Sequence, residues 1–230
     1  MCGRFTVNLT FEELENYVKE NYAIEDIKSF SLPRYNVAPG TEVISLLHDG
    51  SKYRIGELRW GFIPSFVKND ESFSLINIKS ETIFEKEMFK KVALQQRCVI
   101  LADSFYEWNQ NQKNDFPRRI MLKEKKIFKM ASIWNTYIKS DGTKIHTVGI
   151  LTTEANDLIK EIHHRMPVIL TDETEKTWLN PREKNEKILY DILKPYESQK
   201  MMMHRVTKKI NSPLYQEEDA IKDIGVIYEE

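Results

Sequence analysis

The chain has 230 residues, 41% of them hydrophobic, which is enough for one sizeable core at the upper end of single-domain length. Lys and Arg (34) nearly balance Asp and Glu (35), so the net charge of −1 excludes a diffuse, histone-like nucleic-acid binder but leaves room for a local basic cleft. Two cysteines cannot build a disulfide framework, and neither a transmembrane-length apolar run nor a signal peptide is present, so we expect a cytoplasmic protein.

The first part of the chain predicts strands around one capped helix. Residues 2–8 are expected to form a short strand that buries the start of the chain. Thr10 and Glu13 have the spacing of a capping box, and apolar residues then recur at helical intervals. Residues 33–40 are rich in turn formers. Two strands joined by a turn at Asp49 and Gly50 are expected next, over 42–48 and 53–59.

The rest of the chain predicts more strands than helices. Apolar residues at 84, 88 and 92 mark a second helix, and residues 154–163 a third. Two more helices are expected between 172 and 194, and the polar segment after 210 could be a wrap-around tail. Further strands are expected near 97–107, 118–123, 126–138, 144–152 and 167–170. This order predicts an α+β fold with a curved, mostly antiparallel sheet and peripheral helices, in a single domain over 1–230.

Cys2 is the first candidate for chemistry. Removal of Met1, which a small second residue permits, would leave Cys2 with an amine and a thiol on adjacent carbons. The amine titrates at about pH 8 and the thiol about half a unit higher, so part of the amine is free base near neutral pH. The amine could catch an aldehyde as a Schiff base, and the thiol could then close a thiazolidine ring. Taken alone, a cysteine at position 2 could equally be there by chance.

Three further residues could move protons or hold that amine. Glu107 ends an apolar strand between aromatic residues, where burial would raise its pKa; the alternative is a glutamate that faces water. Asn77 interrupts an apolar stretch and, if it points inward, needs hydrogen-bond partners, which a neighbouring loop could equally supply. His163 lies where a helix gives way to a strand, and could either shuttle a proton or cap carbonyl groups.

Cations and aromatic residues near these positions suggest a site for a phosphodiester chain. Arg4, Lys79 and Arg165 each lie within a few residues of a candidate, so the cations converge if the candidates do. Thr152 and Thr153 could donate hydroxyls to a phosphate, or cap a following helix. Unpaired bases could stack on aromatic side chains, about two of which we expect to be exposed, among Trp60, Phe62, Phe66, Tyr106 and Trp108.

Other catalytic motifs are missing from the sequence. It contains no glycine-rich phosphate loop, no paired CxxC, no HExxH and no GxSxG. Cys98, His163 and His164 lack the spacing of metal ligands, so neither a metal nor a cofactor is expected.

Seven sequence blocks, taken in order, cover residues 1–5, 34–40, 60–65, 77–82, 97–99, 105–108 and 163–170. Together they resemble the SRAP family of abasic-site-processing proteins. The resemblance implies a barrel-like SRAP fold in a protein of the SOS response that acts as a monomer on abasic sites in single-stranded DNA. It implies that the ring-opened site is crosslinked through Cys2, with associated lyase and reversal activities.

The resemblance also implies a role for each candidate. Cys2 would be the nucleophile, Asn77 would orient its amine, Glu107 would move protons during Schiff-base formation, and His163 would act on the sugar oxygen. Phosphates and bases would be contacted by Arg4, Lys79, Thr152, Arg165, Trp108 and Phe66.

Two positions depart from the family pattern. Lys79 stands where the family usually has arginine, so a two-pronged phosphate contact becomes a point charge. Phe66 stands where tryptophan is common, which would weaken a stacking contact. We therefore expect crosslinking to survive and the affinity for undamaged strands to be low.

Two alternatives come from other classes. Glutamine amidotransferases of the N-terminal-nucleophile type also begin Met-Cys-Gly, but they attack an amide and usually carry an aliphatic residue where this chain has Arg4. A non-catalytic module that grips single strands, with a structural Cys2, is the second. A proteolytic role is also ascribed to the family; because only Met1 precedes Cys2, no self-cleavage beyond methionine removal is required here.

Overall fold

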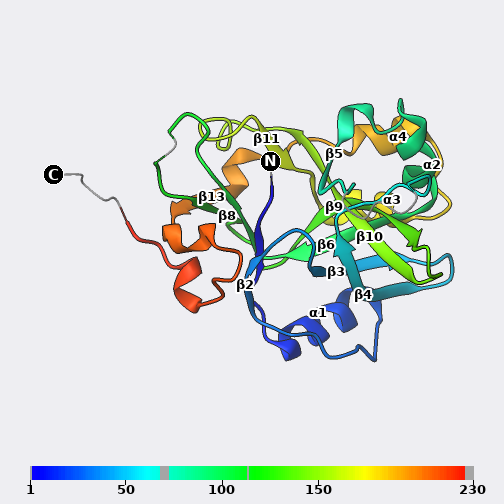
Figure 1. Cartoon of the computed structure of the whole chain (residues 1–230), viewed down its shortest axis with the longest axis horizontal. Helices are drawn as coiled ribbons and strands as arrows, with labels where there is room; N and C mark the ends of the chain where they lie inside the picture. Colours follow the sequence, from blue (N-terminus) through cyan, green and yellow to red (C-terminus); the bar gives the residue numbers. More distant parts are fainter. Residues whose placement is uncertain (1, 68–72, 113, 226–230) are drawn as a thin grey trace.

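A closed barrel forms the centre of the computed structural model, which describes residues 2–67, 73–112 and 114–225 (Figure 1). Neighbouring barrel strands pair in the order β10–β4–β3–β6–β9, and β9 pairs back onto β10 to close the ring. These strands are β3 (Glu42–His48), β4 (Tyr53–Trp60), β6 (Arg97–Ala102), β9 (Phe128–Ile138) and β10 (Lys144–Glu154). Their pairings are antiparallel except for β4 with β10.

Short strands extend the barrel where β10 ends. β5 (Asn77–Lys79) runs parallel to β10, and β11 (Arg165–Pro167) runs antiparallel to it. β12 (Ile169–Leu170) pairs with β9. Thr152 of β10 therefore lies between Lys79 on one side and Pro167 on the other, which brings three segments distant in sequence to one place.

A second sheet packs beside the barrel and contains the start of the chain. Its strand order is β13–β8–β7–β1–β2, and all four pairings are antiparallel. The strands are β1 (Phe5–Val7), β2 (Arg34–Val37), β7 (Ser104–Glu107), β8 (Arg118–Leu122) and β13 (Met201–Arg205). The sequence predicted turns for β2 and left β13 unassigned, because both segments are short and carry polar residues inside the strand.

The single strand predicted over 97–107 is wrong, because the chain divides at Asp103 into β6 of the barrel and β7 of the second sheet. The Asp103 carboxylate accepts hydrogen bonds from the Asn8 backbone N–H, the Thr6 hydroxyl and the Arg119 guanidinium, each at 2.7 Å. These hydrogen bonds hold the turn at Asp103 between β6 and β7. They also satisfy the buried Asp103 carboxylate, which would otherwise be costly to remove from water. The corner sets Glu107 on the strand next to β1.

Helices lie at the periphery of the two sheets. α1 (Phe11–Tyr22) carries the predicted capping box, in which the Thr10 hydroxyl accepts from the Glu13 N–H and the Glu13 carboxylate accepts from the Thr10 N–H. In Figure 1, α2 to α4 gather on one side of the barrel and α1 lies below it. Their bounds are Glu87–Gln95 for α2, Asp172–Leu179 for α3 and Glu186–Asp191 for α4.

The helix predicted over 154–163 is wrong, since this segment forms turns. Isolated bonds such as that from the His163 N–H to the Ile159 carbonyl give single helical turns. The tail after 210 does wrap back onto the second sheet, through the short 3-10 helices η3 (Lys208–Asn211) and η4 (Glu218–Ile221) (Figure 1). The α+β class with mostly antiparallel, curved sheets and peripheral helices is confirmed.

Candidate functional site

Asn77 holds the backbone of Cys2. Its side-chain Nδ2 donates to the Cys2 carbonyl oxygen at 2.9 Å, and its position is set by the parallel pairing of β5 with β10 at Ile150. The other amide atom, Oδ1, is buried and accepts no hydrogen bond from the residues that the structure describes. A buried acceptor in this state is costly and uncommon. The Asn77 amide thus fixes the start of the chain and keeps one acceptor available beside it.

The Cys2 thiol is fully buried. Burial raises the pKa of this thiol far above its ordinary value, and the nearby negative charge of Glu107 raises it further. The sulfur is therefore a neutral thiol at physiological pH, and it needs a base before it can act as a nucleophile.

Glu107 lies at the end of β7 and is 2% exposed. β7 pairs with β1 at Phe5, and the Tyr106 N–H donates to the Arg4 carbonyl at 2.9 Å, so Glu107 is carried to the start of the chain. Burial raises the pKa of the Glu107 carboxyl to about 7, and a hydrogen bond from the Trp108 backbone acts in the opposite direction. Near neutral pH the carboxyl can both give and take a proton, as a general acid–base group must.

His163 is 4% exposed and sits just before β11. Its Nδ1 accepts from the Arg165 backbone N–H at 2.8 Å. Burial lowers the pKa of the His163 imidazole to about 4, and the neighbouring His164 lowers it further. The ring is therefore neutral at pH 7, so any proton it transfers comes from a neutral imidazole.

A backbone contact joins the Glu107 and His163 segments. The Gln110 N–H, three residues beyond Glu107, donates to the carbonyl of Ile162 at 2.9 Å. Asn77 contacts the Cys2 carbonyl, and the charge of Glu107 acts on the Cys2 thiol. With the Gln110–Ile162 bond, these interactions bring the four candidate catalytic residues together between the two sheets: Cys2, Asn77, Glu107 and His163.

Arg165 is already paired with an acid. Its two Nη atoms contact the two carboxylate oxygens of Glu81 at 2.6 and 2.8 Å, and one of them also donates to the Thr152 carbonyl at 2.7 Å. The side chain of Arg165 is 7% exposed, and Thr152 is fully buried. The expected phosphate contacts of these two residues therefore require a rearrangement in which phosphate replaces the Glu81 carboxylate.

Arg4, just before β1, contacts the ring of Trp108, just after the neighbouring strand β7. The Arg4 guanidinium lies 5.8 Å from the centre of the Trp108 ring, within the range of a cation–π contact. Arg4 donates to the Ile210 carbonyl at 2.8 Å, and the Trp108 indole N–H donates to the Asn211 side chain at 2.7 Å. Arg4 also donates to Asn36 Oδ1 at 2.8 Å. The pair is thus held by the C-terminal η3.

Two of the predicted DNA contacts are accessible. Lys79 is exposed at the end of β5, and the ring of Phe66 is 63% exposed. Trp108 is half-buried, whereas the other aromatic candidates lie in the core. The buried ones are Trp60, Phe62 and Tyr106, so one of the five, Phe66, is exposed where about two at best were expected, and Trp108 is the other ring with an accessible part.

Sequence reasoning missed Asn36, Glu81 and Gln110. Asn36 and Glu81 lie inside blocks that carry the family resemblance, and a polar residue in a short apolar strand was a usable signal for Asn36. Gln110 gave no signal, because a glutamine in a polar loop is ordinary.

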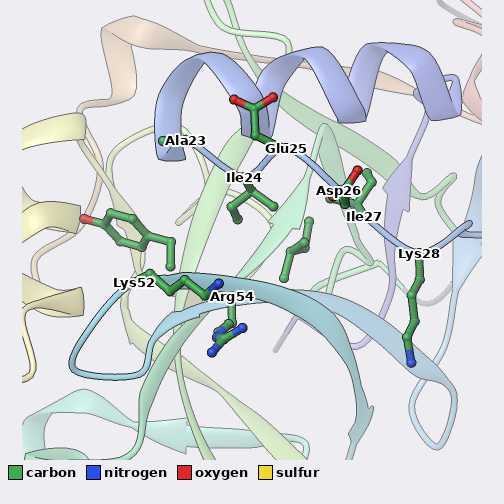
Figure 2. Close-up of a pocket in the computed structure, with 10 residues that line it drawn as sticks. Ala23, Ile24, Glu25, Asp26, Ile27, Lys28, Lys52 and Arg54 are labelled. Carbon is green, nitrogen blue, oxygen red and sulfur yellow. The ribbon is translucent and has the colours of Figure 1, made fainter.

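A cavity of about 390 Å³ lies away from these residues (Figure 2). It is lined by the segment that follows α1, with Glu25, Asp26 and Lys28, and by the start of β4, with Lys52 and Arg54. Acidic and basic side chains occur together there, and none of the candidate site residues lines it. This cavity is not part of the candidate site.

Two further features bear on the class of protein. The described residues contain no group of three or more His, Cys, Asp or Glu side chains that could hold a metal ion. Within the same residues, none of the helices has the length and apolar character needed to cross a membrane.

Residues 1–213 match the family model described as SOS response associated peptidase (SRAP). The chain belongs to the SRAP family. It is 40% identical to the abasic site processing protein YoqW of Bacillus subtilis over 217 residues, which cover 93% of this chain and 95% of that one. It is 30% identical to YedK of Escherichia coli, covering 78% and 79% of the two chains.

Solved structures share the fold of this SRAP chain. A crystal structure of a protein from Bacteroides thetaiotaomicron superposes with a TM-score of 0.72 at 28% identity, covering 83% of this chain and 85% of the other. One from Bordetella bronchiseptica has a TM-score of 0.74 at 21% identity, covering 90% and 100%, and this likeness concerns the fold alone.

Proposed function

We propose that this protein processes abasic sites in single-stranded DNA by forming a covalent bond through Cys2 after Met1 has been removed. The observation that carries the proposal is the Asn77 amide, which holds the Cys2 carbonyl at 2.9 Å beside the carboxyl of Glu107. The relatives YoqW and YedK are named abasic site processing proteins, which supports the same substrate. A monomer in the cytoplasm, associated with DNA, is part of this proposal.

The reaction begins at nitrogen. The α-amine of Cys2 adds to the aldehyde carbon of the ring-opened sugar, and the carbinolamine loses water to give an imine. Glu107 takes the proton that leaves the amine and returns it to the departing hydroxyl, a role that suits a carboxyl with a pKa of about 7. Asn77 Oδ1 can accept from the amine N–H and orient its lone pair.

The sulfur then closes the ring. The thiol adds to the imine carbon while its proton passes to the imine nitrogen, so that aldehyde and aminothiol give a thiazolidine and one water. Because burial and the charge of Glu107 keep the free thiol protonated, ring closure needs a base, and we assign that role to the Glu107 carboxylate, whose charge the thiol senses. His163 acts on the sugar ring oxygen during opening and during reversal. β-Elimination through the imine would account for strand cleavage.

The strand is held by charge and stacking. Lys79 and Arg4 provide positive charge at the site, Phe66 and Trp108 provide ring faces, and Arg165 joins them once phosphate displaces Glu81. The positive charge is local, as the overall charge of −1 requires.

The test uses untagged protein whose loss of Met1 has been verified by intact mass. It is mixed with a uracil-containing single strand that has been treated with a glycosylase, and the products are separated on a denaturing gel. We expect a heat-stable adduct whose mass is that of protein plus DNA minus one water. The matched control is the same strand with its uracil intact, which should give no adduct.

Two variants sharpen this test. Cys2→Ala, and a protein that keeps an N-terminal tag, should both fail to form the adduct. A tagged protein that crosslinks normally would contradict the role of the free amine. Salt-sensitive binding with no adduct would instead indicate a binding module, and ammonia release from glutamine would indicate an amidotransferase.

A further inference from the structure

Gln110 bridges the two adjacent histidines. The rings of His163 and His164 are stacked, with centroids 4.7 Å apart and planes 14° apart. The Gln110 side-chain amide spans their edges: as placed, its nitrogen Nε2 lies 2.8 Å from His163 Nε2 and its oxygen Oε1 lies 2.9 Å from His164 Nδ1, and the two ends of an amide are alike enough in size to exchange. The Gln110 backbone N–H donates to the Ile162 carbonyl, and this bond holds the main chain so that the side-chain amide lies between the two rings.

The other ring nitrogen of His163, Nδ1, faces both the backbone N–H and the backbone carbonyl of Arg165. The Arg165 N–H lies 2.8 Å from Nδ1, and the Arg165 carbonyl oxygen lies 3.1 Å from it. A neutral imidazole has one donor and one acceptor nitrogen, so the backbone alone leaves two tautomers available. The shorter contact favours Nδ1 as the acceptor, with the proton on Nε2.

We propose that Gln110 is a positioning residue that selects the tautomer of His163 with the proton on Nε2. A half-turn of the amide about its last bond presents its oxygen to the Nε2–H, while its nitrogen donates to His164 Nδ1. All three contacts are then satisfied together, because an amide offers an acceptor at one end and a donor at the other. This orientation requires His164 Nδ1 to act as the acceptor, with the His164 proton on Nε2.

The consequence for chemistry rests on the proposed function. The His163 ring is neutral at pH 7, so it exchanges protons through its tautomers and not through an imidazolium. A partner that fixes the tautomer therefore determines whether Nε2 donates to the sugar oxygen or accepts from it. Gln110 occupies Nε2 in the free protein and is the group that the sugar oxygen would replace there.

The test reads the tautomer directly in the DNA-free protein, by long-range ¹H–¹⁵N correlation of the histidine ring nitrogens at pH 7.5. His163→Ala and His164→Ala assign the signals. In the wild-type protein we expect Nε2 of His163 to be protonated and Nδ1 unprotonated. In Gln110→Ala the two nitrogen shifts should move toward one another, as both tautomers become populated. In Gln110→Glu, Nε2 should stay protonated, because a carboxylate only accepts.

A matched control and a kinetic measurement complete the test. Gln112→Ala, two residues along the same loop, should leave the His163 signals unchanged. Release of a preformed adduct should slow about tenfold in Gln110→Ala and recover in Gln110→Glu, with the single-strand Kd within about twofold of wild type. Unchanged His163 shifts in Gln110→Ala would overturn the proposal. A wild type that forms no adduct would overturn the proposed function and leave the spectroscopic result to stand alone.

Discussion

Glu81 and Arg165 form a two-pronged ion pair, carboxylate to guanidinium, at 2.6 and 2.8 Å. The geometry is the one that a phosphate would also adopt with this arginine. In the free protein, the Glu81 carboxylate therefore occupies the place that the resemblance assigns to DNA, and binding must break one strong contact to make another.

Glu81→Gln should tighten binding to single strands by about threefold to tenfold, since it removes a competing charge and leaves Arg165 available. The logarithm of the binding constant should fall more steeply with the logarithm of the salt concentration, by an amount that corresponds to about one additional phosphate contact. Fluorescence anisotropy across a salt series measures both. The matched control is Glu85→Gln, which removes the same charge from the neighbouring surface and should change the affinity less. Weaker binding by Glu81→Gln would show that the pair orients Arg165.

Lys79→Arg should raise the affinity for single strands a few-fold without changing the rate of adduct formation at saturating DNA. Lys79 is exposed at the end of β5, so the longer side chain has room, and a guanidinium contacts phosphate at two points. Separate measurements of Kd and of the single-turnover rate distinguish the two effects. A changed rate with unchanged Kd would place Lys79 in the chemistry.

Glu107→Gln should change how stability depends on pH. Burial raises the pKa of Glu107 in the folded protein to about 7, from an ordinary value of 4.5. Between these values the folded state binds more protons than the unfolded state, so Glu107 makes the wild type less stable as pH rises through this window. The difference in unfolding free energy, wild type minus Glu107→Gln, should fall from pH 4.5 to 7 and then level off. Denaturant titrations at several pH values measure it, and a flat difference would contradict the buried carboxyl.

Cys2→Ser should separate the two steps of the reaction. The amine remains, so an imine still forms, but a hydroxyl closes the ring poorly compared with a thiol. We expect a denaturant-resistant product only after borohydride reduction, as seen by gel and intact mass. A stable adduct without reductant would argue against thiazolidine closure.

His163→Ala should slow adduct release and strand cleavage by about 10- to 100-fold while single-strand affinity changes less than about twofold. Because the pKa of His163 is lowered to about 4, the wild-type rates should show no inflection from this residue between pH 6 and 8. Release kinetics from purified adduct and anisotropy binding check the two parts. Equal losses in the release rate and in the single-strand affinity would indicate that His163 contacts the DNA.

The sequence predicted most of the strands, the class and the cap of α1, because these depend on local patterns such as the Thr10–Glu13 box. It could not predict the division at Asp103. One apolar run gives no sign that its halves enter different sheets, since the corner depends on contacts with Asn8, Thr6 and Arg119. The false helix at 154–163 also depends on distant contacts, because Asn156 donates its side-chain amide to the Tyr196 carbonyl and the segment forms separate turns.

For the candidate site, the residue types and the family blocks identified the candidate residues, but their hydrogen-bond and ion-pair partners come only from the fold. The contact from Asn77 to the Cys2 carbonyl and the burial of Glu107 follow from strand pairing. The pairing of Arg165 with Glu81 links residues 84 positions apart, and nothing in the local sequence of either predicts it.

η3 accepts hydrogen bonds from Arg4 and Trp108, so residues 206 positions apart in the sequence, Arg4 and Ile210, form one supported surface. A chain that ends before residue 208 lacks this support. Because synthesis runs from the amino terminus, the Arg4–Trp108 pair gains this support only after residues 208–211 have been made.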